Sequence, residues 1–199
     1  MTHTLSPRLG RAHPARAFEA DAARPGASVA GVASIRAIVP TIPEDWAVFQ
    51  ALSPTSHLVM GPGGIFTVSV HPLAGDWAWA WVDQRTLLVA GRRTSFLRDA
   101  EVDSARVTEL LRARIALRVP VRPVVTLVGA RLLGRGKAAA STAVPVLPAE
   151  DLAAWLAAQP RVLRAGERMD LAGLIDHPGT WGTDRNFGPG LPSLRATRT

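Results

Sequence analysis

The sequence contains no cysteine, a single lysine (Lys137) and no long uninterrupted apolar run. Without cysteine, the protein has no disulfides, no thiolate nucleophile and no cysteine-ligated zinc. Residues 27–43 are fairly apolar, but Gly31, Arg36 and Pro40 interrupt them, so nothing approaches the ~18 apolar residues of a membrane span. No clean apolar run follows the N-terminal arginines either, and the cytoplasm is therefore the expected location.

The composition is that of a soluble globular protein. A chain of 199 residues suits one domain with tails, and 47% hydrophobic and 20% charged residues fit such a domain. The formal net charge is +7, and a basic surface favours nucleic acid or an anionic membrane as partner. Codon bias also produces arginine-rich and alanine-rich chains, so charge alone leaves DNA as an open candidate partner.

Three regions are predicted: a mobile arm rich in Arg, Ala and Pro at 1–25, a folded domain at 26–175, and a disordered basic tail at 176–199. Periodicity and turn residues predict the elements of the domain. Helices are expected at 27–39, 97–117, 148–158 and 165–174, and strands at 46–52, 56–61, 64–71, 76–82, 86–90, 123–129 and 143–147, with a loop at 131–142. The fold class is therefore α/β, with a mixed central sheet that starts as an antiparallel meander and is flanked by helices.

The central feature is a hairpin around Gly61-Pro62-Gly63-Gly64, which is dense turn punctuation between two β-type runs. A turn centred on Pro62-Gly63 places Ser56 opposite Ser69. Alternation then assigns two faces. One face carries Ser56, Leu58, Met60, Ile65, Thr67, Ser69 and His71, and the other, expected to be the main core, carries His57, Val59, Phe66, Val68 and Val70. His57 is expected to be a hydrogen-bonded structural histidine.

This hairpin resembles the central hairpin of the nuclease-related domain (NERD) family. That pattern has an acid-His pair, apolar residues, Gly-Pro-Gly-Gly, an apolar-aromatic pair and then acid-any-lysine. His57, the turn and Ile65-Phe66 match it, whereas the acidic positions hold Ser56 and Ser69 and the lysine position holds His71. Further matches extend the likeness over about 27–165: Pro43-Glu44-Asp45-Trp46, Val89-Ala90-Gly91-Arg92, Arg98 and Val128-Gly129-Ala130.

The resemblance implies a restriction-endonuclease-like fold and descent from magnesium-dependent DNA-cutting enzymes. In such a site carboxylates hold a divalent ion that activates water, and the lysine stabilises negative charge. A Gly-Glu pair expected in the first helix falls on Gly31-Val32, so the departures are Val32, Ser56, Ser69 and His71. They imply lost or strongly reduced catalysis. We therefore expect a degenerate nuclease-fold protein that binds nucleic acid or another partner, with no cofactor unless residual activity uses magnesium.

Two alternatives stay open. One is an active metal-dependent endonuclease with a rearranged site, in which Asp99 or Glu101 acts together with His71. The other is a structural protein with no nucleic-acid partner. Candidate phosphate contacts are Arg92, Arg93, Arg98 and Lys137, although a solvated helix face gives a similar pattern.

Trp77, Trp79 and Trp81 fall on one face of the strand at 76–82. They are either a stacking platform for bases or an aromatic face packed against the core or a partner. The second interpretation is favoured here. The oligomeric state stays open.

Overall fold

The computed structural model describes residues 38, 42–51, 55–73, 79–83, 85–136, 143–177 and 180–181. The predicted arm at 1–25, the predicted helix at 27–39 apart from Ile38, and residues 182–199 lie outside the described residues.

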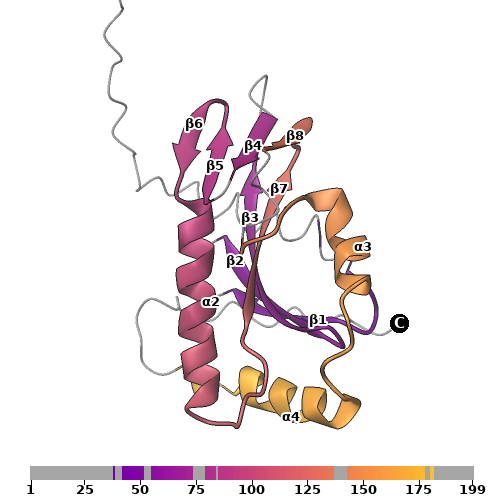
Figure 1. Ribbon diagram of the computed structural model, residues 1–199. Coiled ribbons are helices and arrows are strands. Elements are labelled where there is room, and N and C mark those ends of the chain that lie inside the picture. The colour runs from indigo at the N-terminus through magenta and orange to yellow at the C-terminus, as the bar shows by residue number, and fades with distance from the viewer. Residues whose placement is uncertain are drawn as a thin grey trace, which may run out of the picture.

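The predicted α/β class is confirmed, with a five-stranded mixed sheet at its centre (Figure 1). Its strands lie in the order β1 (Ala47–Ala51), β2 (Ser56–Gly61), β3 (Gly64–Pro72), β7 (Arg122–Val128) and β9 (Val146–Pro148). The first three strands pair antiparallel, as predicted, and β3, β7 and β9 pair parallel.

A second, four-stranded sheet has the order β6 (Arg92–Thr94), β5 (Thr86–Val89), β4 (Trp79–Asp83) and β8 (Leu132–Arg135). The strands predicted for the central sheet are therefore divided between two sheets. Both edges of β3 are occupied, by β2 on one side and β7 on the other, so β4 has no edge there to join. It pairs instead with β5 and, in parallel, with β8.

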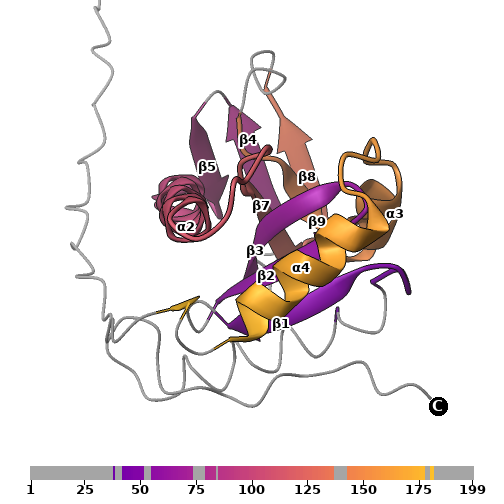
Figure 2. The same cartoon turned by 90° about the horizontal axis from the view of Figure 1, so that it is seen from below.

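Helix α2 (Phe96–Arg112) runs beside both sheets (Figure 1), and α4 (Ala165–Asp176) crosses the end of the five-stranded sheet that holds β1 and β2 (Figure 2). The short helices η4 (Ala149–Asp151) and α3 (Leu152–Ala157) lie on the opposite face. The five-stranded sheet is therefore covered on both faces, which is typical of a sheet that contains parallel strands.

Three groups of buried apolar side chains hold these layers together. The first joins one hairpin face to α3 and includes Val59, Phe66, Val68, Val70, Leu152 and Leu156. The second joins the other hairpin face to α2 and α4 and includes Leu58, Met60, Ile65, Val107, Leu111, Leu171 and Ile175. The third lies between the sheets and includes Ala80, Val82, Leu87, Val125, Leu127 and Val146. Both hairpin faces are thus core, and not only the face that carries His57.

Several boundaries differ from the sequence predictions. Helix α2 ends at Arg112 and not at Leu117, because the chain turns so that Ile115 and Leu117 pack against the second cluster. The predicted loop at 131–142 contains β8, whose partner β4 is far away in the sequence and so invisible to local periodicity.

The start of the predicted disordered tail is packed. Thr180 is buried, and its hydroxyl donates a hydrogen bond to the carbonyl of Leu174. The indole N–H of Trp181 donates to the carbonyl of Ile175 at 2.8 Å. The ordered chain therefore extends past the predicted boundary at residue 176.

Candidate functional site

The hairpin register agrees with the sequence prediction. Ser56 lies opposite Ser69, Met60 opposite Ile65, and Gly61 opposite Gly64. A Cβ atom at Gly61 would lie 2.1 Å from Cδ2 of Trp46, so the absence of a side chain there lets that ring lie over the strand. The turn is set by packing as well as by backbone freedom.

The hydroxyls at the two acidic positions of the family pattern are inside the protein. Ser56 is 1% exposed and Ser69 is 4% exposed. Strand β2 is buried along its whole length, because its two faces belong to different core clusters. A phosphodiester in a nucleic-acid chain has no open path to these two side chains.

One acid does reach the hairpin, and it comes from helix α2. Burial raises the pKa of the Asp103 carboxyl above its usual value, and the nearby Ser56 hydroxyl and the positive charge of Arg106 oppose this shift. The negative charge of Asp99, one turn earlier, raises the Asp103 pKa further. This pair was not singled out from the sequence. The available signal was position, since Asp103 is three residues after buried Ala100 and four before buried Val107.

His71, at the lysine position of the family pattern, stacks on Phe96 with ring centroids 3.6 Å apart and planes 6° apart. Burial lowers the pKa of His71 to about 4, while the charge of Asp99 opposes this shift. His71 is therefore neutral near pH 7 and supplies no positive charge for a developing anion. Asp99 itself accepts a hydrogen bond from the Ser95 hydroxyl at 2.7 Å.

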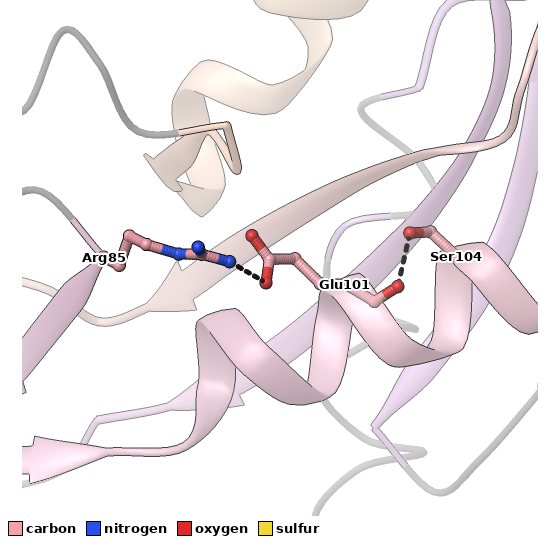
Figure 3. A network of polar contacts seen from close by, with 3 residues as sticks. All are labelled: Arg85, Glu101 and Ser104. Carbon is pink, nitrogen blue, oxygen red and sulfur yellow. Dashed lines mark hydrogen bonds and ion pairs between the residues drawn. The ribbon is translucent and has the colours of Figure 1, made fainter.

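Glu101 points elsewhere. Its carboxylate pairs with Arg85 at 3.2 Å, and its backbone carbonyl accepts a hydrogen bond from Ser104 (Figure 3). The ion pair borders a hollow of about 470 Å³ between the start of α2 and residues 143–144. Of the two acids considered for a rearranged site, Asp99 acts on His71 and Glu101 is engaged with Arg85.

The donor atoms around the hairpin do not fit magnesium, which takes carboxylate, carbonyl and water oxygens in an octahedral arrangement. Two neutral hydroxyls and a single carboxyl fall short of that set of oxygen ligands. Across the described ranges, no three His, Asp or Glu side chains are placed together to hold a metal ion.

His57 lies on the opposite face of the hairpin and is buried, as a structural histidine would be. Burial lowers the pKa of His57 to about 4, and its Nε2 atom has no hydrogen-bond partner among the residues that the structure describes. It acts as a neutral, buried side chain beside the first core cluster.

Three of the candidate phosphate contacts lie close together along the chain, at the end of the second sheet and the start of α2. Arg92 and Arg93 lie on β6, Arg98 lies in the first turn of α2, and all three are exposed. We call these three residues the basic corner. Lys137 and Val32 lie outside the described residues.

The favoured interpretation was an aromatic face packed on the core or on a partner, and packing on the core is wrong for two of the three rings. Trp79 is 37% exposed and Trp81 is 43% exposed. Their neighbours Ala80 and Val82 fill the core side of β4 instead. Trp77 lies outside the described residues.

The fold and site define a mixed α/β domain with a closed polar hairpin and an exposed basic corner. Comparison of the chain with protein-family models, with curated proteins and with solved structures returned no match. No helix in the described part of the chain is long and apolar enough to cross a membrane.

Proposed function

We propose that this chain is a nucleic-acid-binding module that descends from a nuclease fold of the NERD type and no longer cuts its ligand. The observation that carries the binding half of the proposal is the basic corner, where three exposed arginines occur within seven residues. Guanidinium groups bind phosphate through charge and bidentate hydrogen bonds. The proposal takes DNA as the ligand and the cytoplasm as the location.

Acidic neighbours of the basic corner are engaged within the protein. Asp99 accepts the hydrogen bond from Ser95, and Glu101 pairs with Arg85. Both carboxylates are therefore occupied by contacts within the protein. The formal net charge of the whole chain is +7. The corner therefore favours an anionic partner.

The hairpin geometry supports the loss of cutting. Phosphodiester hydrolysis at a site of this kind requires a metal ion that the phosphate can reach. It also requires a positively charged side chain beside the negative charge that develops in the reaction. Here the two serines are buried and His71 is neutral near pH 7.

Binding is tested by fluorescence anisotropy with labelled DNA across a salt series. We expect the logarithm of the affinity to fall linearly with the logarithm of salt. Replacing Arg92, Arg93 and Arg98 by alanine should reduce that slope by up to about 3. The matched control replaces Arg112, Arg114 and Arg118 by alanine. These three arginines are exposed at and beyond the other end of α2, and their replacement removes the same amount of positive charge. Equal losses of DNA affinity in both variants would reject the basic corner as the binding site. No DNA binding by the parent protein at low salt would reject the proposed function.

Cutting is tested with supercoiled plasmid and magnesium or manganese. The plasmid should stay intact. Nicking that disappears in His71→Ala or Asp103→Asn, with binding retained, would overturn the non-cleaving half of the proposal and favour the rearranged site.

A further inference from the structure

The outer surface of the four-stranded sheet carries large aromatic rings with no cover from the described part of the chain. Trp79 and Trp81 are two residues apart on β4, so both point to the same side, with Cα atoms about 6.6 Å apart along the strand. The inner side of the same strand is core. We call the surface formed by Trp79, Trp81, Leu88 and Arg93 the tryptophan face.

Trp81 lies over a residue without a side chain. A Cβ atom at Gly134 would lie 2.2 Å from Cε3 and 2.6 Å from Cζ3 of Trp81, so the benzene part of the indole occupies the space of a missing side chain. Gly134 pairs with Trp81 in the register of β4 and β8. One side of the ring is therefore supported by the sheet, and the 43% exposure of this residue leaves the other side open.

Trp79 reaches toward a different edge of the sheet. Its Cη2 and Cζ2 atoms would lie 3.7 and 3.9 Å from a Cβ atom at Gly91, in the turn between β5 and β6. The two rings thus extend over different strands, Trp81 over β8 and Trp79 toward the turn between β5 and β6, and they do not cover each other. Two separate aromatic surfaces are presented side by side.

One arginine places a positive charge on the tryptophan face. Trp81 pairs with Leu88, and Leu88 pairs with Arg93, so the arginine lies in the same cross-strand row about 10 Å away. Arg93 also belongs to the basic corner. Asp83 is the acid on this side of β4, and one of its carboxylate oxygens is buried, close to where a Cβ atom at Gly136 would lie.

We propose that the tryptophan face is a stacking platform for single-stranded nucleic acid, with one unpaired base on Trp79, one on Trp81 and a phosphate on Arg93. Bases in a duplex are stacked on each other, whereas those of a single strand are free to stack on exposed indoles. This inference rests on the proposed function and narrows it to a strand class and a surface. Base stacking is tolerant of sequence, so the preference concerns strandedness and not a motif.

The test compares a labelled 12-nucleotide oligothymidine with a duplex of equal length at low salt. The key variant replaces Trp79 and Trp81 by leucine, because leucine keeps an apolar cover over Gly134 and removes the stacking surface. The matched control is Val162→Ala with Met169→Ala, which removes exposed apolar groups near the hairpin turn and on α4, away from the second sheet (Figure 1). Thermal melting confirms that each variant is folded.

We expect the parent protein to bind the single strand more tightly than the duplex, with tryptophan emission changing on binding. The leucine variant should lose at least about 10-fold in affinity for the single strand and little for the duplex, since each stacked base contributes about 5- to 100-fold. A ribose version of the oligonucleotide distinguishes RNA from DNA as the preferred source.

Unchanged affinity in the leucine variant, with loss in the basic-corner variant, would reject the tryptophan face and keep the proposed function. A duplex preference in the parent protein would also reject it. No binding of either ligand by the parent protein would reject both proposals.

Discussion

In the five-stranded sheet the hydroxyls of Ser56 and Ser69 lie inside the protein, whereas in the four-stranded sheet the rings of Trp79 and Trp81 face outward. Polarity alone would assign these pairs the other way round. The difference follows from the layers. The central sheet is covered on both faces by helices and by the second sheet, and the second sheet has its core on one face only. Position in the layering decides burial, and local contacts then adapt to it.

The strongest challenge to this comparison is an acid in the closed hairpin. Ser69→Asp introduces the acid that the family pattern has at this position, opposite Ser56. A buried charge without a cation costs about 3–5 kcal/mol, so thermal melting should fall by on the order of 10 °C. Ser69→Ala is the control and should stay close to the parent protein. A Ser69→Asp protein that melts with the parent would mean that this position is open to water.

Acid should weaken the protein before its carboxylates titrate, because two histidines are buried in the neutral state. The pKa of His57 is lowered by burial from 6.5 to about 4, so the unfolded chain binds more protons between these values. The stability from the neutral form is therefore complete above pH 6.5 and is lost as the pH falls toward 4, by about 3 kcal/mol for His57.

His71 shifts in the same direction, while the raised pKa of Asp103 acts in the opposite direction, favouring stability at low pH. Denaturant unfolding at several pH values measures the sum. His57→Leu should flatten the profile between pH 6.5 and 4, since leucine suits the apolar surroundings. A profile of unchanged steepness in that variant would contradict the assignment to His57.

The two sheets also offer one substitution in two settings. A Cβ atom at Gly61 would overlap Trp46, which is 7% exposed, and a Cβ atom at Gly134 would overlap Trp81, which is 43% exposed. Gly61→Ala should cost about 1–3 kcal/mol, because the buried ring cannot move away. Gly134→Ala should cost less than about 1 kcal/mol, because the exposed ring can swing into solvent. Chemical denaturation of both variants measures the two losses in the free energy of unfolding. Equal losses would show that Trp81 is held as firmly as Trp46.

The sequence predicted the parts of the fold that depend on local rules. The hairpin register from Ser56 to Ser69 follows from one turn and alternation, and the structure agrees at every pair. The division into two sheets depends on which strand edges are free, and β8 depends on a partner about 50 residues away, so neither is visible in a local pattern. The relation of Asp103 to Ser56 is not visible locally for the same reason, because the packing of α2 on the hairpin creates it.

The smallest effect is expected at the ion pair that turns Glu101 away from the hairpin. Arg85 and Glu101 are 3.2 Å apart, and the arginine is exposed (Figure 3). Exposed pairs stabilise proteins by about 0–1 kcal/mol, because water and salt screen them and two long side chains must be ordered. Glu101→Gln should therefore melt within about 4 °C of the parent protein at physiological salt. Asp103→Asn on the same helix is the matched comparison, and it should change the stability in a pH-dependent way because its carboxyl is partly buried. A loss above about 1 kcal/mol in Glu101→Gln would show that this side of α2, like the hairpin side, depends on a specific polar contact.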